Sequence, residues 1–214
     1  MIVVDIGNTN IVIGLFVNQK LKNIIRLDTK DKKLIIKLEN IFNSSKISKL
    51  KLENKNCIIS SVSDYSEKKI INFFTKKKFN LLNVNINNIP GNIKFKYERN
   101  QLGADRIANT FAAIKKYGKN LLIVDFGTAT TFDVIVNNVY EGGVISPGIN
   151  ISHDALVSYA SKLKKISIVK VKKITGKNTK NSMQSGFYWG YTALINGVIK
   201  KIIVEKKYKP KIIL

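Results

Sequence analysis

The 214-residue sequence predicts an α/β fold built from two similar halves. Short apolar runs typical of strands alternate with amphipathic stretches of helical period, which favours this class. One pattern also occurs twice, at residues 2–16 and 122–136: an apolar strand, an Asp-x-Gly turn with polar neighbours, and a second strand. The chain is long enough for two small, similar domains, and we place them at 1–102 and 103–214.

Strand and helix patterns follow one another closely in the N-terminal half. The stretch 66–79, for example, carries Ile70, Ile71, Phe73 and Phe74 at the spacing of an amphipathic helix. We expect strands at 2–6, 11–16, 19–27, 56–62 and 81–89, helices at 32–42 and 66–79, and a turn at Pro90-Gly91.

In the C-terminal half, a helix begins near Ala104 and turns Ile107 and Phe111 toward the core. The stretch 142–148 contains three glycines and a proline, so we expect a turn there that cannot be a strand interior. The remaining elements that we expect are strands at 122–126 and 132–136, a helix at 151–159, a long helix that starts after Gly176 and stops at Pro210, and a strand from 211.

The net charge of +23 and the pI near 10.0 raise the possibility of a nucleic-acid-binding protein. The lysines are spread along the chain, however, at 30–33, 46–55, 76–78, 162–177 and 200–211. The same stretches are rich in Asn and Ile, and no recognisable nucleic-acid module accompanies them. A general compositional bias explains the lysines better, so we expect weak, salt-sensitive binding and no specific nucleic-acid partner.

No apolar run approaches the ~20 residues that span a bilayer, and the N-terminus has neither a basic segment nor a cleavage site. We therefore expect a cytoplasmic protein with no membrane partner. The single cysteine, Cys57, cannot form an internal disulfide, and its apolar neighbours indicate a small buried side chain rather than a reactive thiol.

Each copy of the repeat ends its first strand with an aspartate, Asp5 or Asp125, just before a glycine. Glycine brings backbone N–H groups close to a ligand, and neighbouring hydroxyl and amide groups add donors, so the turns suit phosphate oxygens. A carboxylate about 4 Å from a phosphate charge is repelled by roughly 4 kcal/mol at an effective dielectric of ~20, unless a cation lies between them. Either aspartate alone could simply cap its turn. Two in matching contexts favour cations and phosphate, with one nucleotide between two facing turns.

A third group of polar residues, Gly103-Ala104-Asp105-Arg106, lies at a predicted helix N-terminus, where the helix dipole stabilises a carboxylate. An aspartate in a first helical turn is common and needs no function. Alternatively, Arg106 could bind a substrate carboxylate while Asp105 takes a hydroxyl proton. Spacing alone slightly favours the purely structural role.

Five segments follow one another in register: DIGNTN (5–10), GADR (103–106), DFGTATTFD (125–133), GGVISPG (142–148) and GKNTxxSMQSG (176–186). Together they resemble the type III pantothenate kinases, which belong to the actin-like (ribonuclease H-like) and sugar-kinase ATPase superfamily. The resemblance implies a duplicated fold with an interdomain nucleotide cleft. It also implies ATP-dependent phosphorylation of pantothenate to 4′-phosphopantothenate, the first step of coenzyme A biosynthesis. A non-catalytic ATP-binding or regulatory relative, or another small-molecule kinase of the superfamily, is the alternative.

The same resemblance assigns site residues. It implies that Asp105 is the general base, that Asp5 lies near Mg²⁺, and that Asp125 coordinates a monovalent cation, K⁺ or NH₄⁺. The residues implied to bind ATP are Asp5, Ile6, Gly7, Asn8, Thr9, Asn10, Ile11, Val12 and Thr128. Those implied to line the pantothenate pocket are Tyr97, Gly103, Ala104, Asp105, Arg106 and Thr179.

Without the resemblance, Tyr97 would be a half-buried packing residue and Thr179 a helix N-terminal cap. We expect a surface or capping role for His153, the only histidine. The resemblance further implies a homodimer, with part of the last long helix facing the partner chain. Similar enzymes continue past the final strand into a Gly-Gly turn that contacts adenosine, so we expect the chain to lack this last adenosine-binding element.

Overall fold

The computed structural model describes residues 1–48, 50, 55–90, 93–98 and 100–214. The chain divides into two compact units. The first comprises Met1–Gly91 and Glu98–Phe111, and the second comprises Asn92–Tyr97 and Ala112–Leu214. This division follows contacts in space, and the boundary that we placed between residues 102 and 103 stays a prediction.

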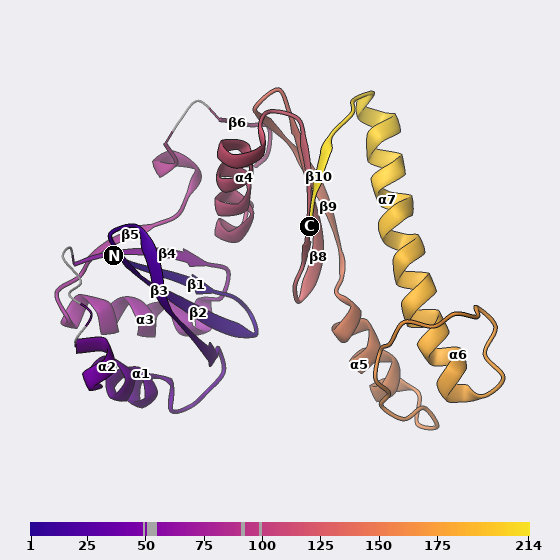
Figure 1. Ribbon diagram of the computed structural model, residues 1–214, viewed down its shortest axis with the longest axis horizontal. Helices are drawn as coiled ribbons and strands as arrows, with labels where there is room; N and C mark the ends of the chain where they lie inside the picture. Colours follow the sequence, from indigo (N-terminus) through magenta and orange to yellow (C-terminus); the bar gives the residue numbers. More distant parts are fainter. Residues whose placement is uncertain (49, 51–54, 91–92, 99) are drawn as a thin grey trace. The chain divides into compact units, whose positions relative to one another are not determined.

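The first unit contains a five-stranded sheet in the order β3-β2-β1-β4-β5 (Figure 1). Strands β1, β2 and β3 are antiparallel neighbours, whereas β4 runs parallel to β1 and β5 parallel to β4. The elements are β1 (Ile2–Ile6), β2 (Asn10–Val17), β3 (Lys20–Asp28), α1 (Leu34–Phe42), α2 (Ser45–Ser48), β4 (Asn56–Ser61), α3 (Asp64–Lys76), β5 (Asn80–Asn83) and the short 3₁₀ helix η1 (Ile86–Asn88).

The second unit contains another five-stranded sheet, in the order β10-β7-β8-β9-β6 (Figure 1). Helix α4 (Ala104–Tyr117) precedes β7, and its residues are divided between the two units. The other elements are β6 (Lys94–Phe95), β7 (Leu121–Phe126), β8 (Ala129–Val136), β9 (Val139–Pro147), α5 (Ile149–Tyr159), α6 (Thr179–Ser185), the π-helical turn η2 (Gly186–Gly190), α7 (Tyr191–Lys206) and β10 (Lys211–Ile213).

The two sheets confirm the duplication predicted from the sequence. In the second unit, β7, β8 and β9 form an antiparallel meander and β10 joins β7 in parallel. The first unit has the same arrangement, with β1, β2 and β3 as the meander and β4 parallel to β1. Each Asp-x-Gly turn therefore connects the first two strands of one meander.

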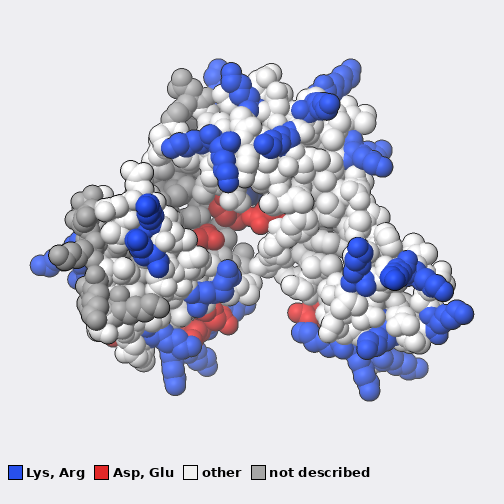
Figure 2. Space-filling model, in the orientation of Figure 1, with Lys and Arg blue, Asp and Glu red and all other residues white. Residues whose placement is uncertain are grey.

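Lysine and arginine side chains lie over many elements of the face shown in Figure 2. They are not confined to one helix or one strand, as their spread along the sequence led us to expect. Within the described ranges, no helix is long and apolar enough to cross a bilayer.

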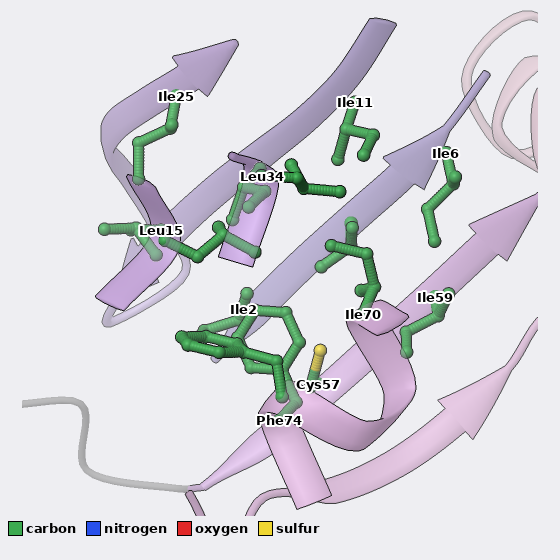
Figure 3. Close-up of a cluster of buried hydrophobic side chains, with 14 of the residues drawn as sticks. Ile2, Ile6, Ile11, Leu15, Ile25, Leu34, Cys57, Ile59, Ile70 and Phe74 are labelled. Carbon is green, nitrogen blue, oxygen red and sulfur yellow. The ribbon is translucent and has the colours of Figure 1, made fainter. Parts of the chain in front are cut away.

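The core of the first unit lies between its sheet and helices α1 and α3 (Figure 3). In β1, the side chains of Ile2, Val4 and Ile6 are fully buried, while Asp5 is exposed. Because successive side chains of a strand point to opposite faces, burial of Ile6 leaves Asp5 on the face away from this core. The thiol of Cys57 is fully buried in the same core, as predicted.

In the second unit, apolar residues of β7 and β8 pack against α7 and its flanks. Leu122 and Phe132 are fully buried there, and Ile202 of α7 is nearly so. The repeated strand pattern thus forms a second apolar layer that supports the second turn.

Our prediction for 142–148 is wrong, because β9 runs through Gly142 and Gly143. Gly142 pairs with Val134 and Tyr140 with Ile135, so Glu141 is an extra residue on β9. Gly142 has a φ of 118°, in the region that favours glycine. The glycine therefore marks a β-bulge inside a strand rather than the end of one.

The predicted strand at 81–89 is also too long. Strand β5 ends at Asn83, and the Asn85 side chain accepts a hydrogen bond from the N–H of Asn87 at 2.9 Å, which caps η1. Asparagine side chains that bond to nearby backbone compete with a strand ladder. The turn predicted at Pro90-Gly91 falls partly outside the described residues.

The last long helix is confirmed as a continuous run of α6, η2 and α7. It ends at Lys206, because Lys207 adopts a left-handed conformation with φ 49°. The helix therefore stops before Pro210 rather than at it. Strand β10 follows, as predicted.

Candidate active site

The first Asp-x-Gly turn connects β1 and β2 through Gly7, Asn8 and Thr9. The N–H of Gly7 donates to the carbonyl oxygen of Asn10 at 2.9 Å, which closes the turn. A Cβ atom on Gly7 would lie 3.1 Å from that oxygen, so a side chain would strain the closure. Asn8 and Thr9 are exposed and present their polar side chains, as the sequence predicts for a phosphate-binding turn.

Two residues that sequence reasoning missed support this turn. Thr29, which follows β3 and is 1% exposed, donates its N–H to Thr9 and its hydroxyl to the carbonyl oxygen of Gly7, at 3.0 and 2.7 Å. The Ser66 hydroxyl of α3 donates to the carbonyl oxygen of Thr29 at 2.6 Å. A single threonine after a strand carries no local signal of this role, because the contact depends on how the sheet and helix pack.

Contacts within the first unit connect the N-terminus of α4 to the same end of the sheet. The N–H of Val62, just after β4, donates to the carbonyl oxygen of Ile6 at 3.0 Å. A Cβ on Gly103 would lie 3.2 Å from a Val62 methyl carbon and 2.5 Å from Asp105 Oδ1. Because β1 and β4 are parallel, Asp5 and the Gly103–Arg106 segment therefore lie at the carboxyl end of the same strand pair.

The Asp105 carboxylate is oriented by its own helix. The N–H of Arg106 donates to Asp105 Oδ1 at 2.7 Å in the first turn of α4. N–H groups of a first turn lack intrahelical acceptors and stabilise a nearby negative charge. Arg106 itself is 6% exposed, so its long side chain is held within the protein rather than in solvent.

The second Asp-x-Gly turn connects β7 and β8 through Gly127 and Thr128. The N–H of Gly127 donates to the carbonyl oxygen of Ala129 at 3.0 Å. Asp125 and Thr128 are both half-buried. The N–H of Gly148, just after β9, donates to the carbonyl oxygen of Thr128 at 3.1 Å.

The other predicted substrate residues of the second unit lie in two separate settings. The ring of Tyr97 packs edge-on against Tyr140, with ring centroids 5.9 Å apart and planes at 82°. The fully buried Tyr140 donates its hydroxyl to Asp133 Oδ1 at 2.7 Å. Thr179, by contrast, begins α6.

Thr179 lines a cavity of about 520 Å³. The lining residues are mostly apolar: Leu156, Leu163, Thr179, Ser182, Met183, Gly186 and Phe187. The cap of α6 is Asn178, whose side chain accepts from the N–H of Asn181 at 2.9 Å. Thr179 is therefore not the capping residue, and it is one of the few polar residues that line the cavity.

The expected surface or capping role of His153 is wrong. The residue is 3% exposed, and its ring packs against Phe187, with ring centroids 5.2 Å apart. The segment that follows α5 folds back over the imidazole, which brings Ile166 against its Nε2 atom. A position close to a helix start gives no sign of such a long-range return of the chain.

The cation hypothesis can be tested against the donor groups present. Among the described residues, no group of three or more His, Cys, Asp or Glu side chains comes together to hold a metal ion. Asp5 and Asp125 are each a carboxylate beside a turn of backbone and hydroxyl groups. The Asp5 arrangement fits Mg²⁺, which proteins commonly bind through one or two carboxylates together with water and substrate phosphates.

Comparison with known proteins gives a consistent result. A family model described as type III pantothenate kinase matches residues 1–201. Relatives named type III pantothenate kinase include one from Persephonella marina, 42% identical over 99% of this chain and 84% of its own length, and one from Pelagibacter ubique, 40% identical over 100% and 86%.

Among solved structures, a protein from Campylobacter jejuni, described as a Baf family transcriptional activator, has a TM-score of 0.57 at 20% identity. The alignment covers 99% of this chain and 81% of that one, and it shows a shared fold. The fold is α/β and duplicated, as the two corresponding sheets of this chain show. Given the family model and the relatives, this chain belongs to the type III pantothenate kinase family.

Proposed function

We propose that this protein transfers the γ-phosphoryl group of ATP to the primary hydroxyl of pantothenate, giving 4′-phosphopantothenate and ADP. This is the first step of coenzyme A biosynthesis. The observation that carries the proposal is the strand pair β1 and β4, whose carboxyl end holds both Asp5 and the Asp105 segment. A turn suited to phosphate and a candidate base in one compact unit support phosphoryl transfer as the reaction class.

ATP phosphates bind to the turn that spans Asp5, Ile6, Gly7, Asn8, Thr9, Asn10, Ile11 and Val12, with Thr128 as a further contact. Ile6 and Ile11 are fully buried, so they contribute backbone groups rather than side chains. Gly7 allows the close approach of a phosphate, and the Asn8 and Thr9 side chains are exposed donors. Positioning and charge neutralisation supply most of the catalysis of phosphoryl transfer.

Asp105 is the general base. As the pantothenate hydroxyl oxygen bonds to the γ-phosphorus, the bond from that phosphorus to the β,γ-bridging oxygen breaks and ADP leaves. The hydroxyl proton passes to the Asp105 carboxylate. The Arg106 N–H that contacts Asp105 Oδ1 at 2.7 Å fixes the direction of the carboxylate. General-base help of this kind contributes about 10²–10⁴-fold.

Pantothenate is held by Gly103, Ala104, Arg106, Tyr97 and Thr179. Arg106 is suited to the substrate carboxylate, because a guanidinium can donate two parallel hydrogen bonds to it. Thr179 supplies a hydroxyl from the wall of the 520 Å³ cavity. Tyr97 offers an aromatic ring whose position is fixed by the buried Tyr140.

The proposal includes two cations, one at each Asp-x-Gly turn. Asp5 would hold Mg²⁺ through water, and Asp125 would hold the monovalent cation, K⁺ or NH₄⁺. Bound there, the cations would neutralise charge on the phosphates and reduce their repulsion from the two carboxylates. We also infer a cytoplasmic homodimer, in which part of the α6–η2–α7 run faces the partner chain. Phe187, Tyr188 and Trp189 of η2 are only half-buried within one chain, which supports this use of the surface.

The decisive experiment measures phosphorylation of pantothenate with ATP and Mg²⁺, in K⁺ and in Na⁺, for wild type and Asp105→Asn. We expect product in K⁺, little in Na⁺, and a loss of about 10²–10⁴-fold in kcat for Asp105→Asn. The matched control is Asp64→Asn, which makes the same change in the first turn of α3, at an exposed position.

The control should keep wild-type turnover. Equal turnover by Asp105→Asn would remove this residue from the role of base. ATP binding without any pantothenate phosphorylation would instead indicate a non-catalytic relative or a kinase for another small molecule.

A further inference from the structure

His153 is a buried, titratable side chain that the proposed reaction does not use. It lies in α5, is 3% exposed and is the only histidine of the chain. Its ring packs edge-on against Phe187, with centroids 5.2 Å apart and planes at 73°. Phe187 in turn lines the cavity that contains Thr179.

The two ring nitrogens of His153 have different partners. The backbone N–H of Ile166 donates to Nε2 at 3.3 Å, so Nε2 must carry a lone pair. Nδ1 lies 3.5 Å from Asp154 Oδ1, a carboxylate oxygen that can only accept. Both contacts coexist only in the neutral tautomer with the proton on Nδ1.

The partner of Nε2 belongs to a segment, 160–178, that contains no helix or strand. This segment carries Leu163, which lines the Thr179 cavity three residues before Ile166. It is also tied to α6 by Gln184, whose side-chain N–H donates to the carbonyl oxygen of Ser167 at 3.1 Å. His153 therefore touches two parts of the cavity wall, Phe187 directly and the segment through Ile166.

We propose that neutral His153 is a positioning residue for the phosphorylation of pantothenate, and that its protonation releases the 160–178 segment from the Thr179 cavity. A second ring proton would set an N–H at Nε2 against the N–H of Ile166, which replaces an attraction by a repulsion. Acid then weakens binding of pantothenate without removing any group that acts on the phosphate. The proposal rests on the proposed function through the role of Thr179 in binding pantothenate.

The charged groups around the ring do not provide another route to the same effect. Asp154 is mostly exposed, and its pKa is lowered by the hydrogen bond from Lys165, with Nζ 3.0 Å from Oδ1. Asp154 therefore stays ionised through mildly acidic pH and keeps the proton on Nδ1. Phe187, the described contact from η2, carries no titratable group.

A direct test uses protein labelled with ¹⁵N-histidine and carrying no histidine tag. Because the chain has one histidine, its imidazole nitrogens give one set of NMR signals. We expect the neutral Nδ1–H form at pH 7.5, with the Ile166 amide signal moving together with the ring as the pH falls to 5.5. An Nε2–H tautomer or a cationic ring at pH 7.5 would overturn the proposal, whether or not the protein is active.

A second test compares His153→Gln with His153→Leu by steady-state kinetics between pH 5.5 and 7.5. The Gln side chain keeps an acceptor for Ile166 but does not titrate, whereas Leu removes the acceptor. For wild type, we expect the KM for pantothenate to rise about 2- to 10-fold in acid, as for the loss of one hydrogen bond. The Gln variant should show no such rise, and the Leu variant should show the raised KM at every pH.

The KM for ATP and the kcat at saturating pantothenate should follow the same pH dependence in all three proteins. The proposal fails if the KM for pantothenate has the same pH profile in wild type and in His153→Gln. Should the Leu variant not fold, the comparison of wild type with Gln still decides. A protein with no pantothenate kinase activity would refute the proposed function, while the NMR test of the contact between His153 and Ile166 stands.

Discussion

In the first unit, Thr29 follows β3 and donates its N–H to the Asp-x-Gly turn, at the carbonyl oxygen of Thr9, 3.0 Å away. In the second unit, Gly148 follows β9 and makes the corresponding bond to the carbonyl oxygen of Thr128, 3.1 Å away. The two turns thus share one backbone hydrogen bond at corresponding positions. What differs is how each bond is supported.

Thr29 adds a hydroxyl bond to Gly7 and is itself held by Ser66. Gly148 has no side chain to add, and a Cβ there would lie 2.5 Å from the carbonyl oxygens of both Gly127 and Thr128. The second turn is also shorter, with two residues between its strands where the first has three. Duplication therefore kept the backbone framework, while side-chain bonds hold one turn and close backbone packing holds the other.

The largest effects should come from the two carboxylates. We expect Asp5→Asn and Asp125→Asn each to lower kcat/KM by about 10²–10³-fold, as when one charge-stabilising group is lost from an active site. Asp5→Asn should raise the Mg²⁺ concentration needed for half-maximal activity, and Asp125→Asn that of K⁺. Titration of each cation measures this, with Asp31→Asn, an aspartate outside both turns, as the control. Identical shifts in both variants would mean that the two turns do not divide the cations between them.

The substitution Gly148→Ala should have the next largest effect. The added Cβ meets two backbone oxygens that cannot move freely, so we expect a loss of about 1–3 kcal/mol in the free energy of unfolding. Denaturant titration checks this. Gly197→Ala is the control, because Gly197 lies in α7 with nothing within 4 Å of an added Cβ, and the change should stabilise the protein by up to about 1 kcal/mol. Tolerance of Ala at position 148 would show that the second turn is not held by backbone packing.

Thr29→Val keeps the backbone N–H and the shape of the side chain but removes the hydroxyl bond to Gly7. We expect a loss of about 1 kcal/mol in the free energy of unfolding and a higher KM for ATP, while Thr29→Ser should keep both near wild type. Unfolding curves and steady-state kinetics of the two variants measure this difference. An unchanged KM for ATP in Thr29→Val would mean that the hydroxyl stabilises the fold without shaping the turn.

The smallest expected effect comes from two weakly acidic side chains, one in each unit. Burial raises the pKa of Cys57 and that of Tyr208 to about 12, so both groups keep their protons in the folded protein at pH values where the unfolded chain loses them. Their contribution to stability is therefore complete below about pH 9 and declines as the pH rises toward 12. At pH 10 we expect a loss on the order of 1 kcal/mol from Cys57 and a smaller one from Tyr208.

Denaturant titration at pH 7.5 and 10 measures this decline. Between the two pH values, Cys57→Val should lose less free energy of unfolding than wild type. Tyr208→Phe should also lose less than wild type, but by a smaller margin. An equal loss in wild type and Cys57→Val would exclude the thiol as its source.

The duplicated fold could be predicted because its evidence is periodic and local. Apolar alternation predicts the strands, and the repeat can be recognised from the few adjacent residues of each Asp-x-Gly turn. The bulge at Glu141, the bond from Thr29 to Gly7 and the burial of His153 could not be predicted in this way. Each depends on residues far apart in the chain meeting in space. For the candidate site, motifs picked out Asp5 and Asp105, whereas packing decided what supports them.

The π-helical turn η2 has a consequence for the helical run that contains it. Each residue of an α-helix advances the side-chain direction by about 100°, so the wider turn at Gly186–Gly190 shifts the phase between α6 and α7. Met183 on α6 lines the cavity and Ile202 on α7 packs on the sheet. On an unbroken α-helix these two side chains would point about 100° apart, and the wider turn brings them closer to one face of the run. One continuous helical run thereby turns the apolar residues of both its parts to about the same side, so a single-residue deletion in this turn would rotate one part by about 100° relative to the other.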